Sequence, residues 1–113
     1  MTVLQGSELR LDSPLGCSLE GLNFIYKGSQ RGIGDLSLIQ LATSYLGAPY
    51  LWGGKIPFGI DCSGFVQQIF LMMGKELPRD ASQQVDIGDV VCSDDRQEGD
   101  LAYFVNDNGN VIH

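Results

Sequence analysis

Two residues in this 113-residue sequence have the chemistry for nucleophilic catalysis, a cysteine and a histidine. Cys62 lies in the stretch GIDCSGFVQQIF, between an acid and a serine and just before an apolar run with helical spacing. A thiolate attacks carbonyl carbon, and an imidazole can accept the thiol proton and return it to a leaving amine. His113 is the only histidine in the sequence, so it is the only candidate for that base.

The surroundings of Cys62 favour a reactive thiol. If a helix begins near Asp61, Cys62 occupies its first turn, where free N–H groups and the helix dipole stabilise an anion. A single cysteine is more often a small core residue, but Asp61, Ser63 and Gly64 give it polar and small neighbours. A lone histidine is likewise more often structural, so the pairing of the two residues carries the prediction.

Two helices are predicted to position this cysteine. The first is expected to begin at Asp35 as its N-cap and to stop at Gly47. Its apolar face has helical spacing and comprises Leu38, Leu41, Ala42 and Tyr45. The second helix is expected from about residue 62 to 73, with a wide apolar face, and to end at Gly74.

A short third helix and several strands are predicted further along the chain. Asp80 and Gln83 have the spacing of a capping box. Segments 89–92, 101–105 and 111–113 have the composition of strands, and NDNGN before the last is typical of a turn. This order indicates an α+β domain with helices packed on an antiparallel sheet. Because the sequence stops inside the last strand, we expect the sheet to be incomplete within this chain.

Residues 1–34 are expected to lie outside that domain. Alternating apolar residues predict strands at Glu8 to Leu11 and in LNFIYKG, and GSQRGIGD is typical of a linker or loop. The segment is too short to hold a core alone. We interpret it as the end of an upstream β-rich module or as an extension packed on residues 35–113.

Four blocks of sequence resemble the NlpC/P60 family of papain-like cysteine peptidases. In order, they are GAPYLWGGKIPFGIDCSGFVQQIF, LPRDASQQ, GDLAYFV and GNVIH. The resemblance covers about residues 35–113 and implies a papain-like fold. It also implies cleavage of stem peptides of the bacterial cell wall (peptidoglycan), typically between γ-D-glutamate and a diamino acid such as diaminopimelate or lysine. Members that act on freed stem peptides often carry an SH3-like module ahead of the catalytic part, and residues 1–34 are similar to the end of one.

The resemblance implies roles for individual residues. Cys62 matches the nucleophile and His113 the general base, and Tyr50 matches a tyrosine whose hydroxyl helps to hold the oxyanion. The positions that match substrate-binding residues are Asp61, Ser63, Trp52, Arg79 and Asp80. Trp52 also suits a core aromatic residue, and Asp80 also suits a helix cap.

The family pattern requires a third polar residue, usually a second histidine, that orients the base and lies beyond residue 113. An imidazole without its orienting partner lowers turnover by about ten-thousand-fold in an analogous serine triad. We therefore expect the 113-residue chain by itself to be at most weakly active. A rival interpretation is a cell-wall-binding or scaffolding module of peptidase ancestry that has lost its chemistry.

Charge and hydropathy limit the partners of the protein. Fourteen acidic and seven basic residues give a net charge of −7, which opposes binding to nucleic acid or to anionic lipid. We also expect no membrane span, because no window approaches about 18 uninterrupted apolar residues. The N-terminus lacks the basic and then apolar pattern of an export signal. The sequence leaves open whether the protein acts in the cytoplasm on recycled peptides or is exported.

A metal site is a second rival interpretation. Cys17, Cys62, Cys92 and His113 are the ligand types of a zinc site, but no two cysteines have CxxC spacing, so we expect no metal and no cofactor. The acids between residues 86 and 100 lack the ligand order of an EF-hand and suit a solvated face. Cys17 and Cys92 are equally compatible with a disulfide and with two buried thiols.

Overall fold

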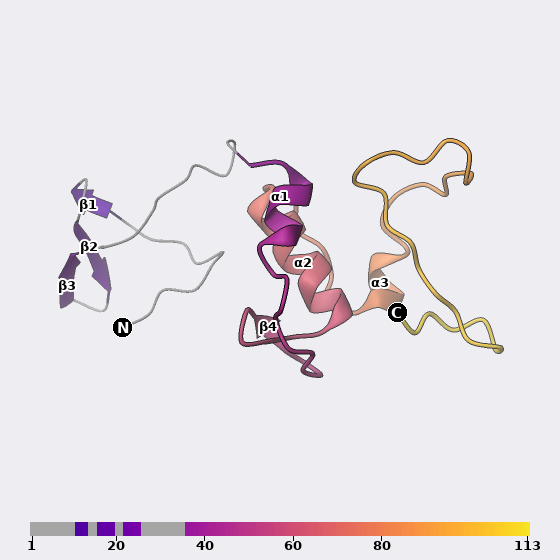
Figure 1. Cartoon of the computed structure of the whole chain (residues 1–113), viewed down its shortest axis with the longest axis horizontal. Coiled ribbons are helices and arrows are strands. Elements are labelled where there is room, and N and C mark those ends of the chain that lie inside the picture. The colour runs from indigo at the N-terminus through magenta and orange to yellow at the C-terminus, as the bar shows by residue number, and fades with distance from the viewer. Residues whose placement is uncertain (1–10, 14–15, 20–21, 26–35) are drawn as a thin grey trace.

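The computed structural model describes residues 11–13, 16–19, 22–25 and 36–113. Near the N-terminus, strands β1 (Leu11–Ser13), β2 (Gly16–Leu19) and β3 (Leu22–Ile25) form an antiparallel sheet in the order β1-β2-β3 (Figure 1). Strands were predicted in this segment, although parts of them, residues 8–10 and Tyr26, lie outside the described residues. No helix in the described part of the chain is long and apolar enough to cross a membrane.

Helix α1 spans Leu38–Thr43 and is capped by Ser37, so the prediction of Asp35 as its cap is wrong. The Gln40 N–H donates to Ser37 Oγ at 3.2 Å, and the Ser37 N–H donates to Gln40 Oε1 at 2.9 Å. This reciprocal capping box satisfies two backbone N–H groups. Asp35 cannot form such a box, because neither glutamine nor glutamate lies three residues after it. The helix ends at Thr43 with Ser44 as its C-cap, earlier than the predicted stop, and turns continue to Gly47, whose φ of 85° suits glycine.

Helix α2 spans Cys62–Met72, within one residue of its predicted limits, and is central to the core (Figure 1). Asp61 is its N-cap, and the chain turns away at Gly74, where φ is 79°. Within residues 36–113, the buried apolar side chains are Leu41, Tyr45, Ile60, Ile69 and Met72. The rings of Tyr45 and Phe65 meet edge to face, with centroids 5.7 Å apart, which joins α2 to the chain that follows α1.

A short hairpin sets the point at which α2 begins. Strands β4 (Lys55–Ile56) and β5 (Gly59–Ile60) pair antiparallel, and the next N–H, of Asp61, donates to Gly54 O at 3.2 Å. A Cβ at Gly54 would overlap the carbonyl oxygen of Gly59. The tight turn at the two glycines of the LWGG segment therefore depends on the absence of a side chain at residue 54.

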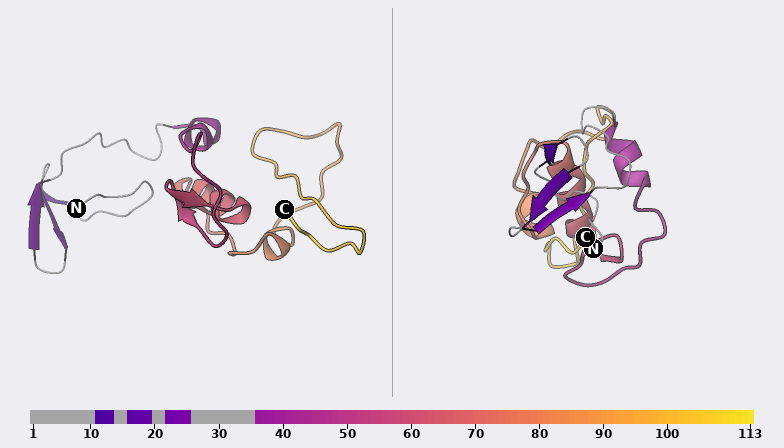
Figure 2. Two further views of the ribbon diagram at one scale, coloured as in Figure 1. Left: turned by 60° about the horizontal axis from the view of Figure 1, so that its bottom comes forward. Right: turned by 90° about the vertical axis from the view of Figure 1, so that its left-hand side faces the viewer.

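Helix α3 (Ala81–Gln84) begins after Asp80, where the capping-box spacing predicted it. Beyond it, residues 85–113 form a wide loop that returns to α3 at the C-terminal residue (Figures 1 and 2). The prediction of strands at 89–92, 101–105 and 111–113 is wrong, because these described residues contain only one isolated bridge, between Val105 and Val111.

The turn between those predicted strands does form. The Gly109 N–H donates to Asn106 O at 2.9 Å, and Gly109 has a φ of 78°. Most residues of the two segments that flank this turn, 101–105 and 111–113, are exposed. A lone two-stranded hairpin with little buried surface is only marginally stable. The domain is thus α+β, as predicted, with an incomplete sheet whose described strands are β4 and β5.

Candidate active site

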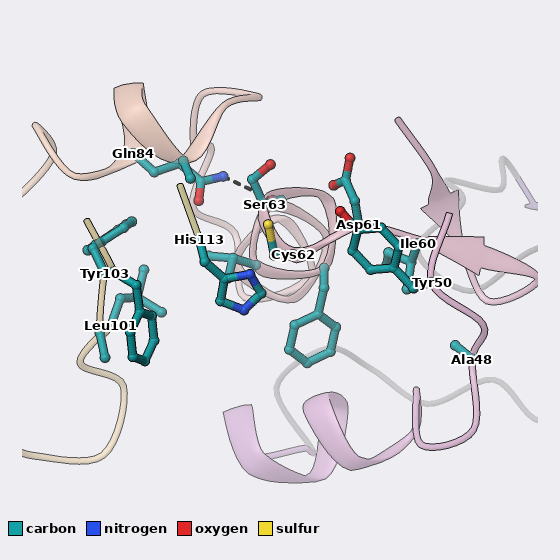
Figure 3. Close-up of a pocket in the computed structure, with 15 residues that line it drawn as sticks. Ala48, Tyr50, Ile60, Asp61, Cys62, Ser63, Gln84, Leu101, Tyr103 and His113 are labelled. Atoms are coloured by element: carbon teal, nitrogen blue, oxygen red, sulfur yellow. Dashed lines mark hydrogen bonds between the residues drawn. The ribbon is translucent and has the colours of Figure 1, made fainter. Parts of the chain in front are cut away.

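Cys62 and His113 line the same cavity, which has a volume of about 420 Å³. Cys62 comes from the first turn of α2, whereas His113 comes from the end of the C-terminal loop (Figure 3). Residues of α3 and of segment 101–104 complete the wall between them. The structure therefore brings together two side chains that are far apart in the sequence and that were predicted to act as a pair.

The thiol of Cys62 is free and half-buried, at the first position of α2. Asp61 Oδ1 accepts the Gly64 N–H at 2.7 Å, which satisfies one of the free amide groups of the first turn. A Cβ at Gly64 would lie 2.5 Å from Gly54 O and 2.8 Å from Asp61 Oδ1. Only glycine leaves room at residue 64 for the LWGG turn to pack beside Cys62.

Asp61 is a buried carboxylate that joins three segments. Besides Gly64, it accepts the Gly53 N–H at 2.8 Å and pairs with Arg79 Nη2 at 2.5 Å. The Arg79 hydrogen bond, together with the two backbone donors, lowers the pKa of Asp61 to about 2, although burial opposes this shift. The carboxylate is therefore ionised at neutral pH, and it holds the LWGG turn, α2 and residue 79 together.

Arg79 extends this network to the other neighbour of the thiol. Its Nη1 donates to Ser63 Oγ at 2.9 Å, so the guanidinium contacts residues on both sides of Cys62. The pKa of Arg79 is raised, chiefly by the hydrogen bond to Asp61 and to a smaller degree by the charges of Asp61, Asp80 and Cys62. A fixed positive charge thus lies within electrostatic range of the sulfur.

His113 is held mainly by its backbone. The Phe104 N–H donates to His113 O at 3.0 Å, and the Ile112 N–H donates to Phe104 O at 2.9 Å. The imidazole also lies against the ring of Phe104, with centroids 5.9 Å apart and planes inclined by 58°. Among the described residues, no side chain hydrogen-bonds to the imidazole.

The other predicted site residues divide into two groups. Tyr50, Asp61 and Ser63 line the cavity, although the Tyr50 side chain is 64% exposed. Trp52, Arg79 and Asp80 do not line it. Trp52 is 83% exposed, which is inconsistent with a core aromatic residue, and Asp80 is the N-cap of α3.

Gln84 is a cavity residue that was not predicted from the sequence. Its side chain is almost fully buried, with 1% exposed, and its amide donates to Ser63 O and to Pro78 O. In the block LPRDASQQ it follows another glutamine, Gln83, which is exposed. Gln84 lies on the inner side of a one-turn helix, and a helix this short has no sequence pattern that distinguishes its inner residues from its outer ones.

The described residues contain no cluster of three or more cysteine, histidine, aspartate and glutamate side chains suited to a metal ion. Cys92 is a free and exposed thiol, which rules out the pair of buried thiols considered for it. In the NDNGN turn, Asn106 Oδ1 accepts backbone N–H groups from Asn108 at 3.1 Å and Asn110 at 2.9 Å. That side chain therefore stabilises the turn.

Comparisons with known proteins place the site in context. Residues 47–113 match the model of the NlpC/P60 family. Gamma-D-glutamyl-L-lysine dipeptidyl-peptidase of Bacillus subtilis is 45% identical over 85 residues, 74% of this chain and 28% of that protein. Gamma-DL-glutamyl hydrolase of the same organism is 43% identical over 74 residues, 64% of this chain and 18% of that protein. The chain thus spans less than a third of the length of these two relatives.

Two solved structures are also similar. An NlpC/P60 family protein from Bacillus cereus matches with a TM-score of 0.69 and 29% identity, over 93% of this chain and 39% of that one. The NlpC/p60 domain of the peptidoglycan hydrolase SagA matches with a TM-score of 0.59 and 34% identity, over 67% of this chain and 65% of that one.

Proposed function

Because the chain belongs to the NlpC/P60 family, we propose that the protein is a cysteine peptidase that cleaves stem peptides of the bacterial cell wall. The bond cut is the one between γ-D-glutamate and a diamino acid. The names of the relatives support this choice, since one is a gamma-D-glutamyl-L-lysine dipeptidyl-peptidase and another a gamma-DL-glutamyl hydrolase.

The observation that carries this proposal is the shared cavity of Cys62 and His113. A nucleophile and a base must reach the same carbonyl group and the same leaving amine, so they must face one space. The cavity provides that space, with apolar walls from Phe65, Val66 and Leu101 that exclude water from part of the site.

In the first half of the proposed reaction, His113 accepts the proton of Cys62, and Sγ attacks the carbonyl carbon of the scissile bond. The resulting oxyanion is stabilised by the Tyr50 hydroxyl and by N–H groups at the start of α2. When the carbon–nitrogen bond breaks, the imidazolium gives its proton to the departing amine. A thioester between Cys62 and the γ-D-glutamyl part remains.

In the second half, His113 takes a proton from water, and the hydroxide formed attacks the thioester. The carbon–sulfur bond breaks, the carboxylic acid leaves and the Cys62 thiol is regenerated. The Asp61, Arg79 and Ser63 network keeps the sulfur in place through both steps, and it presents polar atoms to the stem peptide. Trp52 and Asp80, outside the cavity wall, are proposed to contact the more distant parts of that peptide.

The division of the chain is part of the same proposal. We assign residues 35–113 to the catalytic domain and residues 1–34 to the end of an SH3-like module or to a linker. The match to the B. cereus structure extends over 93% of the chain and is therefore longer than the proposed catalytic domain alone. This extent supports the proposal that part of residues 1–34 corresponds to a segment ahead of the catalytic domain in that protein.

The proposal is tested with the full-length protein and a stem tetrapeptide that contains a γ-D-glutamyl-lysine bond. We expect cleavage of that bond, and a loss of at least about a thousandfold in kcat/KM for Cys62→Ser. Cys92→Ser is the matched control, because Cys92 is exposed and lies outside the cavity. If the wild type binds the peptide but never cuts it, the protein is the scaffolding module instead.

A further inference from the structure

The side chain of Gln84 is the most deeply buried polar group at the cavity. It reaches from α3 toward the first turn of α2, with 1% of the residue exposed. Its Nε2 donates to Ser63 O at 3.0 Å and to Pro78 O at 2.8 Å. Both amide hydrogens are therefore used by backbone carbonyls, one of them next to Cys62 and the other next to Arg79.

These two hydrogen bonds fix the direction of the amide oxygen. Rotating the amide by half a turn would bring Oε1 against the two carbonyl oxygens, which is electrostatically unfavourable. Figure 3 shows Nε2 directed at Ser63 and Oε1 on the side of the amide that faces His113. The acceptor is consequently locked toward the cavity that Gln84 lines.

Oε1 has no hydrogen-bond partner among the residues that the structure describes, and it is not one of their fully buried unpaired atoms, so it remains accessible from the cavity. An acceptor that is held toward a cavity and has no protein partner is available to a donor that enters the cavity, unlike Gln67 Oε1, which is buried without a partner and lies outside the cavity lining. The donor that every peptide substrate brings to such a site is a backbone N–H. The Asp61 carboxylate cannot take that role as readily, since its two oxygens already accept from Gly53, Gly64 and Arg79.

We propose that Gln84 is a substrate-binding residue whose Oε1 accepts a hydrogen bond from an uncleaved amide N–H of the stem peptide next to Cys62. This inference rests on the proposed peptidase function and adds a determinant of specificity to it. Gln84 favours substrates that carry an N–H at one position of the peptide, because a substrate without this N–H leaves Gln84 Oε1 unpaired.

The test replaces each uncleaved amide N–H of the stem tetrapeptide in turn by an ester oxygen. In the full-length wild type, one such replacement is expected to lower kcat/KM by about tenfold. In Gln84→Met, which keeps the volume but removes the acceptor, the same replacement should change kcat/KM by less than about twofold. Penalties at other positions should be equal in the two proteins.

Gln67→Met is the matched control. Gln67 Nε2 donates to Leu77 O at 2.8 Å, so it also ties α2 to the segment before Arg79, but Gln67 does not line the cavity. This variant should retain the tenfold penalty of the wild type. A Gln84 variant with all penalties unchanged would overturn the inference and assign Gln84 a purely structural role.

Two further outcomes keep the result decisive. If Gln84→Met does not fold, the ester series is measured with the wild type alone. If all ester analogues are then cut at the rate of the parent peptide, no uncleaved N–H of the peptide is hydrogen-bonded by the enzyme, and the inference is overturned. If the wild type cuts no peptide at all, the proposed function fails, and the inference fails with it.

Discussion

Cys62 and His113 are held in different ways. Residues 36–84 carry α1, α2, α3 and the β4–β5 hairpin, and they contain all the buried apolar side chains found within residues 36–113. Residues 85–113 contain one isolated bridge and mostly exposed side chains. Cys62 belongs to the first region and His113 to the second.

The proposed active site therefore combines a part held by many contacts with a part held by few. Cys62 is held through its neighbours: the Asp61 carboxylate accepts the Gly64 N–H and pairs with Arg79, and Gln84 donates to Ser63 O. His113 is held by one backbone hydrogen bond, from the Phe104 N–H to its carbonyl oxygen, and by one ring contact. Substitutions near the cysteine should therefore affect both stability and catalysis, whereas substitutions at the histidine should affect catalysis alone.

The largest expected effect is a loss of turnover without a loss of stability. In the full-length protein, His113→Ala should lower kcat by at least about a thousandfold, because no other described side chain in the cavity is an imidazole base. The free energy of unfolding should change by less than about 0.5 kcal/mol, since the residue is exposed. Steady-state kinetics and urea unfolding measure the two. Loss of stability together with activity would contradict the comparison.

A second prediction compares one glycine from each region. Gly64→Ala should destabilise the protein by about 3 kcal/mol, because the added Cβ meets Gly54 O and the Asp61 carboxylate. The matched control is Gly109→Ala, whose Cβ meets nothing within 4 Å, so that it costs only about 1 kcal/mol for a residue with φ of 78°. Urea unfolding gives the loss in free energy of unfolding for each variant. Equal losses would contradict the prediction, because they would show that the LWGG turn shifts to accommodate the added methyl group at little cost.

The third prediction concerns acid. The pKa of Asp61 is about 2 in the folded state, against 3.8 ordinarily, so the unfolded chain takes up a proton first as the pH falls. The carboxylate contributes about 2 kcal/mol of stability above pH 4, and this contribution is lost as the pH falls from about 4 to 2. Urea titrations at several pH values should show this loss in the wild type and lack it in Asp61→Asn. An identical loss in both proteins would contradict the role of Asp61.

The sequence predicted best what depends on neighbouring residues. Helix α2 could be delimited because Asp61 and Gly74 are local signals for its start and end. The start of α1 was misassigned because two capping residues, Asp35 and Ser37, stood close together, and only one of them has a glutamine three residues later. Residue chemistry identified Cys62 and His113, and the family resemblance added Tyr50; the structure brings all three to one cavity.

The sequence could not reveal features that depend on distant contacts. The strands predicted after residue 88 have suitable residues, but a strand forms only where a partner and a covering layer bury it. The close approach of Gly54 to Gly64 joins two segments that no local pattern connects. Gln84 was missed for the same reason, because it differs from its exposed neighbour Gln83 only in what it packs against.

The central claim is that Cys62 and His113 exchange a proton across their shared cavity. The most direct test is the rate at which iodoacetamide alkylates Cys62 of the full-length protein, followed by mass spectrometry as a function of pH. We predict rapid reaction of Cys62 well below pH 8, and a shift of that reaction to higher pH in His113→Ala. Identical pH profiles in the two proteins would contradict the claim.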